Sequence, residues 1–259
     1  MFFGKKGFNN ECSYFFLILC IMSFIILGKS SFYLLIGLFM SFGFFLGFSL
    51  SLRFGVSLTP ALLISLSASS GVILFFVNGY TTKTKSAFLC VIITFTLIIL
   101  IIPTISKNLN IAGFSSEEIE EISALNLTAK MPFEEIVSAV VILSMSGAII
   151  DASIAITSSM YELHNQTKFE NRHKLIASGM KVATELLSSS IHTLFFAFIA
   201  NNLALFFWFY DLNYPHSTVI NSKVFITELT ISLLAGASTV IPLLLTACFS
   251  GYYFMRTKK

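Results

Sequence analysis

Long apolar runs with few charged residues are the feature that most constrains how this chain can fold. A helix needs about twenty mostly apolar residues to cross the hydrocarbon layer of a bilayer. Runs that approach or exceed this length lie near residues 12–28, 32–52, 56–77, 86–106, 134–160, 187–209 and 226–250. Because backbone groups inside lipid must pair within their own segment, each run is predicted to be an α-helix.

The composition supports this interpretation. Only 11% of the 259 residues are charged, whereas soluble domains contain about 25%. A soluble fold of this size cannot bury so much apolar surface, so lipid must cover much of it. We therefore expect one all-α domain over residues 1–259, a polytopic integral membrane bundle of about seven helices in a lipid bilayer. The net charge of +3 is scattered, and without a basic block we expect no nucleic-acid partner.

The distribution of Lys and Arg predicts the orientation of the chain. With the C-terminus inside the cell, the basic residues of the connection 161–181 and of the tail 256–259 lie on the inner side. Positive residues concentrate on the cytoplasmic side of membrane proteins, which favours a multi-pass protein with a cytoplasmic C-terminus. Lys5 and Lys6 argue for the opposite orientation.

The connection on the outer side contains a helical pattern near residues 115–125. Ser115 and Glu118 have the spacing of a capping box, and Ile119 and Ile122 begin an apolar stripe between glutamates. We predict a short amphipathic helix that lies on the membrane surface or against a partner.

Asp151 is the strongest candidate for a functional residue. It lies deep in the fifth run, far from either end. An ionised carboxylate at the centre of a membrane helix costs at least about 2.5 kcal/mol, so it is expected to face protein or water. There it can take up and release a proton.

Small and polar residues accompany Asp151 at helical spacing, as on a helix face that another helix approaches closely. This helix-packing face contains Ser144, Gly147, Ala155, Ser158 and Glu162. Two interpretations stay open. Asp151 is either a proton or ion site, or it makes one hydrogen bond that holds two helices together.

The sixth run offers possible relay partners. Residues 171–186 have the pattern of an interfacial segment, and Glu185, Ser189 and His192 then share one helical face. His192 could pass on a proton because histidine titrates near physiological pH. A simple hydrogen bond between helices explains these residues equally well.

The seventh run carries one more acid and a proline. Glu228 belongs to a packing stripe near the outer end, where its carboxylate can reach the interface. Pro242 should kink the helix, with Ser238 and Thr239 able to satisfy the freed carbonyl groups.

Catalytic and metal-binding motifs are missing from the sequence. It has no HExxH, Walker A or GxSxG motif, and its cysteines and the residues His164 and His173 lack ligand spacing. We therefore expect neither an enzyme nor a bound metal or cofactor.

Three segments resemble a known family in their residues and their order. They are residues 78–83 (NGYTTK), 113–118 (GFSSEE) and 146–163 (SGAIIDASIAITSSMYEL), the last followed by Ser178-Gly179-Met180. Over about residues 30–250 the chain resembles the YibE/F family of bacterial membrane proteins, and within it a short, YibF-like member.

The resemblance implies a bacterial plasma-membrane protein that forms a hetero-oligomer with a larger YibE-like paralogue. Family members often carry an acidic residue where Asp151 stands. Around Ser189 and His192 the chain departs from the family's aliphatic sequence. The region 140–200 also resembles, more weakly, the SecD/SecF-type helices of RND permeases, in which an intramembrane aspartate takes part in proton coupling.

Two functions follow as expectations. The first is a membrane-embedded subunit of a proton-coupled transport or export complex, with Asp151 as the proton or ion site and Glu185 and His192 as relays. The alternative is a non-catalytic scaffold subunit that assembles with the paralogue.

Overall fold

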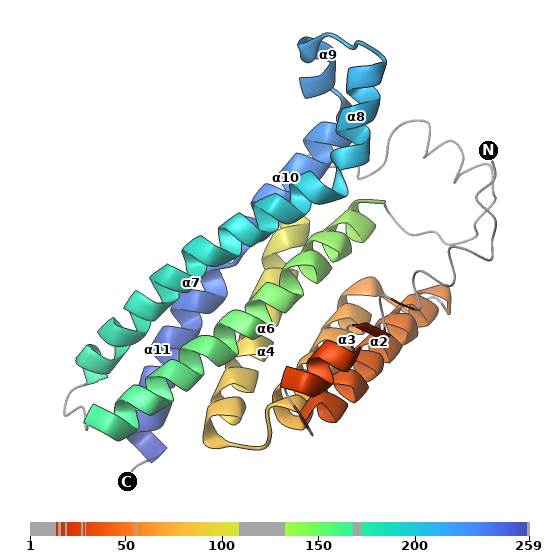
Figure 1. The fold of residues 1–259 in the computed structure, drawn as a ribbon. Coiled ribbons are helices and arrows are strands. Elements are labelled where there is room, and N and C mark those ends of the chain that lie inside the picture. Colours follow the sequence, from red (N-terminus) through yellow and green to blue (C-terminus); the bar gives the residue numbers. More distant parts are fainter. Residues whose placement is uncertain are drawn as a thin grey trace.

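The computed structural model describes residues 14, 17–18, 20–26, 28, 30–54, 56–108, 133–167 and 172–257. The elements of these ranges are all helices (Figure 1). They are α2 (Ser30–Arg53), α3 (Leu58–Gly71), a π-helix (Val72–Val77), α4 (Thr82–Asn108), α6 (Phe133–Thr167), α7 (Arg172–Asn201), α8 (Leu203–Asp211), α9 (His216–Ile220), α10 (Lys223–Ser238) and α11 (Val240–Thr257).

The predicted all-α membrane bundle is confirmed. Six helical stretches of the described chain are long and apolar enough to cross a membrane. They correspond in order to six of the seven predicted spans. The predicted span 12–28 is described only in part, at residues 14, 17–18, 20–26 and 28, and the predicted amphipathic helix near 115–125 lies wholly outside the described residues.

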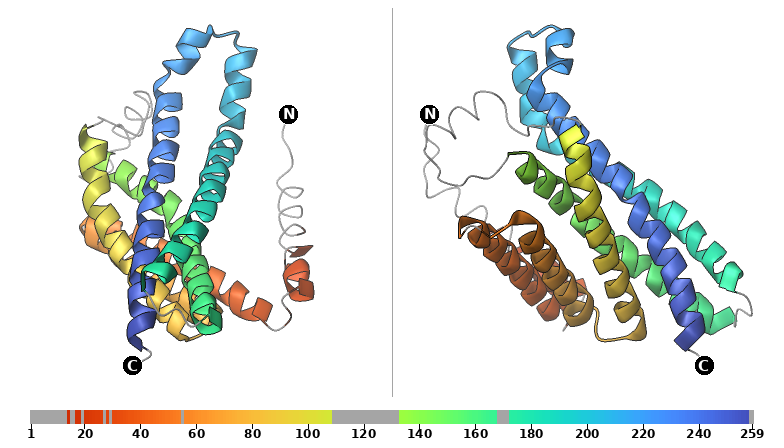
Figure 2. Two further views of the ribbon diagram at one scale, coloured as in Figure 1. Left: turned by 90° about the vertical axis from the view of Figure 1, so that its left-hand side faces the viewer. Right: turned by 180° about the vertical axis from the view of Figure 1, so that it is seen from behind.

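Three helices form the centre of the bundle, with the others on either side. α4, α6 and α11 pack against one another, α7 covers α11 and α6, and α2 and α3 pair beside α4. Figures 1 and 2 show α2 and α3 on one side of the α4–α6 pair and α7, α10 and α11 on the other. The fully buried side chains Phe95, Ile98, Ile142, Met145 and Ile149 fill the contact between α4 and α6.

The sixth span differs from the predicted segment 187–209. α7 is one continuous helix from Arg172 to Asn201, and it includes the segment that was predicted to be interfacial. Leu175, Gly179 and Ala183 form a buried stripe at helical spacing, and this packing extends the helix through the polar sequence. The helix is interrupted at Asn202, and α8 follows at once.

The predicted interruption of the last span is present. α10 ends at Ser238 and α11 begins at Val240, two residues before Pro242. Pro242 has no N–H to donate to the carbonyl of Ser238. The Thr239 hydroxyl donates to the carbonyl of Gly236 over 2.6 Å, so the side chain pairs a carbonyl beside the break.

The turn between the π-helix and α4 is held by its own side chains. The Asn78 amide donates to the carbonyl of Ile73 over 2.8 Å, and Gly79 takes a φ of +80°. The Thr81 N–H donates to the Thr84 hydroxyl over 2.8 Å, and the Thr84 N–H donates to the Thr81 hydroxyl over 3.3 Å. This reciprocal cap fixes the start of α4.

Candidate functional site

Asp151 lies on the outer surface of the chain. It stands near the centre of the candidate membrane span Ser138–Gln166 on α6, yet its side chain is exposed. No hydrogen bond or ion pair joins its carboxyl group to another residue of the described chain. The interior of this chain therefore provides no partner for the carboxyl group.

The rest of the predicted packing face shares this exposure. Ser144, Gly147 and Glu162 are exposed, and Ala155 and Ser158 are partly exposed. A Cβ atom added at Gly147 would meet no heavy atom within 4 Å. No described helix of this chain therefore packs closely against α6 at Gly147.

Glu185 and His192 are also exposed, on α7. Nδ1 of His192 lies 2.7 Å from the carbonyl oxygen of Ser188, and the Thr193 hydroxyl donates to the carbonyl of Ser189 over 3.0 Å. These contacts stay within one helix. Among the described residues, none joins α7 side chains to Asp151.

The packing of α6 against α7 nevertheless places Glu185 and His192 at about the same depth in the membrane as Asp151. The two helices are antiparallel, and a Cβ added at Gly179 would lie 2.5 Å from the sulfur of Met160. Asp151 precedes Met160 by nine residues on α6, and Ser188 follows Gly179 by nine residues on α7. Because the helices are antiparallel, Asp151 and Ser188 lie at about the same level along the bundle. At 1.5 Å per residue, Glu185 and His192 lie within about 6 Å of that level along the axis.

α7 combines polarity with exposure in an unusual way. It is the least apolar of the six candidate spans, and with α2 it is the least buried. A helix that faces lipid is expected to be strongly apolar, as α2 is. The exposed face of α7, which carries Glu185, Ser188, Ser189 and His192, is therefore poorly suited to lipid.

Glu228 lies apart from this group. It is partly exposed near the start of α10, beside the buried Thr227. Its position agrees with the predicted end-of-span location, but the structure shows no described contact between Glu228 and Asp151.

A second polar group was missed by the sequence analysis. Ser86 on α4, Ser153 and Thr157 on α6, and Thr246 and Ser250 on α11 are fully buried. Ser250 lies 3.3 Å from both Ser86 and Thr157, and Ser153 lies 3.3 Å from Thr246, all between hydroxyl oxygens.

These hydroxyl groups hold the three central helices together. The signal in the sequence is a pair of hydroxyl residues four positions apart on each of two spans. Such neutral pairs are typical of contacts between membrane helices.

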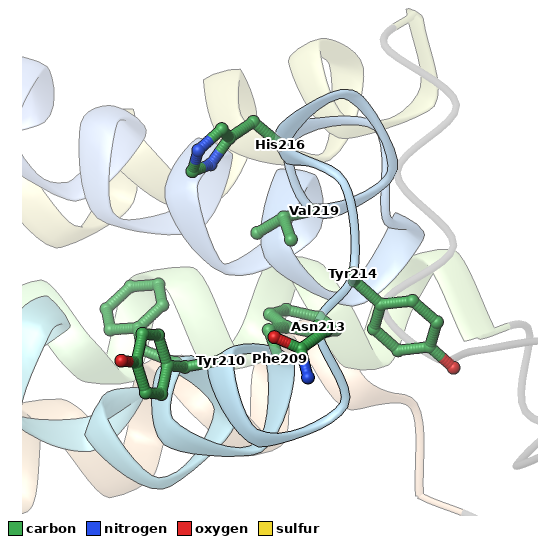
Figure 3. A pocket seen from close by; sticks show the side chains of 7 residues that line it. Phe209, Tyr210, Asn213, Tyr214, His216 and Val219 are labelled. Atoms are coloured by element: carbon green, nitrogen blue, oxygen red, sulfur yellow. The ribbon is translucent and has the colours of Figure 1, made fainter.

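Two pockets of the described chain lie away from Asp151, Glu185 and His192. One of about 380 Å³ is in the α8–α9 hairpin, lined by Phe206, Phe209, Tyr210, Asn213, Tyr214, His216 and Val219 (Figure 3). Another of about 310 Å³ lies between α2 and α3. Within the described chain, no three His, Cys, Asp or Glu side chains gather as metal ligands would. The candidate residues Asp151, Glu185 and His192 therefore lie on exposed faces of α6 and α7.

Comparison with known proteins identifies the family. No curated protein and no solved structure matches the chain. The family described as YibE/F-like protein matches residues 15–256, nearly the whole sequence. The chain therefore belongs to the YibE/F-like protein family.

Proposed function

We propose that this protein is a membrane-embedded subunit of a proton-coupled transport or export complex, in which Asp151 takes up and releases the coupling proton. The observation that carries the proposal is the exposed carboxyl group of Asp151 near the centre of a candidate membrane span. Intramembrane acids are expensive, and they commonly mark proton relays or ion pathways.

The position of Asp151 supports a complex rather than a lone chain. A carboxylate that faces lipid at this depth costs at least about 2.5 kcal/mol. A partner helix or water between subunits would remove that cost. Membership of the YibE/F-like family supports a larger, YibE-like paralogue as the partner.

The polar face of α7 supports a route for protons along the same interface. Glu185 and His192 stand at about the depth of Asp151, and both are exposed. Carboxyl and imidazole groups can each bind and release a proton near neutral pH when their surroundings allow it. In the complex these side chains would relay protons to and from Asp151.

The distribution of basic residues supports the location. The connection before α7 and the C-terminal tail are rich in Lys and Arg, which agrees with a cytoplasmic C-terminus in a bacterial plasma membrane.

A scaffold subunit is the second candidate, and the buried hydroxyl groups favour it. The chain joins its own helices by neutral hydrogen bonds between α4, α6 and α11. By the same logic, Asp151 would be a hydrogen-bonding lock to the paralogue, without titrating.

Two substitutions at Asp151 separate the candidates. Asparagine keeps the shape and hydrogen-bonding capacity of the side chain but cannot ionise, whereas leucine removes both. With the two proteins expressed together, we expect Asp151→Asn to retain co-purification of the paralogue and to abolish transport. We expect Asp151→Leu to lose both. Full transport by the Asp151→Asn complex would favour the scaffold and overturn the proton-relay proposal.

A further inference from the structure

We propose that the α8–α9 hairpin, residues 202–222, is a membrane-surface anchor that lies in the lipid headgroup layer on the side opposite the C-terminus. Neither the family match nor the proposed transport function assigns a role to this segment, and the inference does not depend on the proton site.

The hairpin presents large apolar side chains to its surroundings. Phe207, Trp208 and Tyr210 are 66%, 59% and 83% exposed. No residue of α8 is buried. Water is a poor solvent for such a surface, and exposed apolar patches of this kind mark contacts with a membrane or with protein.

The position of the hairpin places it at the membrane boundary. The candidate spans on either side of it end at Asn201 and begin at Phe225. Figure 2 shows the hairpin at the opposite end of the molecule from the C-terminus, beyond the ends of α4 and α6. Its base is fixed to the bundle by Phe225, whose ring centroid lies 6.2 Å from that of Phe198 and 5.9 Å from that of Phe206.

The polarity of α8 changes along its axis as a membrane interface does. The helix begins with the apolar residues 203–207, continues through Trp208 and Tyr210, and ends at Asp211. Tryptophan and tyrosine concentrate at headgroup depth because their rings are apolar and carry one polar group. This order predicts that Leu203 lies deepest and Asp211 nearest to water.

The distribution around the helix favours lipid over a protein groove. A helix that docks in a groove has one apolar stripe and a polar back. In α8, Phe207 and Trp208 project about 100° apart, and the described side chains are apolar on every side up to Tyr210. A helix that is apolar all round is suited to a membrane environment.

The fold of the tip keeps these rings outside the bundle. Asn213 takes a φ of +52° and turns the chain, and the Tyr214 N–H donates to the carbonyl of Phe209 over 3.3 Å. Figure 3 shows Tyr210 and His216 on one side of the pocket and Tyr214 on the other. Backbone hydrogen bonds thus hold the hairpin in a defined fold, and no described residue of the chain covers its outward surface.

Trp208 allows a direct test because it is the sole tryptophan of the chain. The wild-type protein would be reconstituted in vesicles of phosphatidylcholine and phosphatidylglycerol that carry bromine at graded depths on the acyl chains. We expect blue-shifted Trp208 emission and the strongest quenching by the bromine nearest to the headgroups. Quenching that is strongest at the chain ends, or solvent-like emission without quenching, would overturn the proposal.

A depth reference and a partner control complete the experiment. The double variant Trp208→Phe, Ile93→Trp moves the tryptophan to an exposed mid-span position on α4, where the deepest bromine should quench most. If Trp208 emission is blue-shifted but insensitive to every brominated lipid, the hairpin contacts protein and the lipid anchor is wrong.

Discussion

The polar side chains of this protein fall into two kinds that the bundle treats differently. Hydroxyl groups such as Thr157 and Ser250 are fully buried and paired across helices. The carboxyl group of Asp151 is exposed and has no partner within the described chain. A neutral hydroxyl group costs little to bury when paired, whereas a carboxylate needs either water or another subunit.

The buried hydroxyl groups make a prediction about stability. Ser250 contacts hydroxyl groups on both α4 and α6, so Ser250→Ala should lower the free energy of unfolding by about 0.6 to 1.7 kcal/mol. Thermal unfolding of the chain in detergent would measure this loss. Ser178→Ala is the matched control, since its hydroxyl donates only to Lys174 of the same helix. Equal effects of the two variants would refute a role between helices.

Two glycines make a second prediction. A Cβ at Gly251 would lie 2.5 Å from Cγ1 of the β-branched Ile176, whereas one at Gly147 would meet nothing within 4 Å. Gly251→Ala should therefore destabilise the chain by about 1 to 3 kcal/mol through overpacking. Gly147→Ala should leave the chain by itself unchanged or stabilise it by up to about 1 kcal/mol.

The same pair of glycine variants probes the partner surface. If α6 meets another subunit through the face of Asp151, Gly147→Ala should weaken co-purification of the paralogue although the chain itself stays folded. Normal assembly of this variant, measured by the yield of the complex, would place the interface elsewhere.

At the scale of the helices, α7 is the element whose bounds differ most from the sequence prediction. The apolar run 187–209 indicated a span there, but packing of Leu175, Gly179 and Ala183 starts the helix at Arg172. Periodicity reports which face of a helix is apolar, but it does not report where a neighbouring helix begins. The break before Pro242 was predictable because proline removes a specific hydrogen bond.

The polar face of α7 predicts a difference in accessibility between two exposed helices. In a variant without the four native cysteines, Ser189→Cys on α7 should react with a water-soluble maleimide when the chain is alone in vesicles. Phe42→Cys on α2 should not, because a thiol in lipid does not ionise to the reactive thiolate. Ser189→Cys should become protected when the paralogue is present. Equal reactivity at the two positions would mean that α7 faces lipid as α2 does.

At the scale of the whole molecule, composition and apolar runs were sufficient to predict the helical membrane bundle, because lipid leaves few alternatives for a spanning backbone. Spacing also identified Asp151, Glu185 and His192 as members of polar faces. Sequence spacing could not show that these faces lie on the outside of the chain, since that depends on which helices pack together. The hydroxyl contacts of Ser86, Ser153 and Thr246 were missed for the same reason.

For the whole molecule, we propose that this chain supplies one half of a proton site and that a partner subunit covers it. The exposed carboxyl group of Asp151 and the polar, exposed face of α7 support that proposal. The substitution Asp151→Asn tests it at the level of proton movement.

The most direct measurement is proton uptake by the assembled complex in proteoliposomes that contain a pH-sensitive dye, under an imposed membrane potential. We expect proton uptake by the wild-type complex, and a fall to the level of protein-free vesicles for the Asp151→Asn complex. Asp211→Asn, which changes the other aspartate of the chain in the exposed hairpin, should leave uptake unchanged. Uptake at the wild-type rate by the Asp151→Asn complex would contradict the proposal that Asp151 carries the coupling proton.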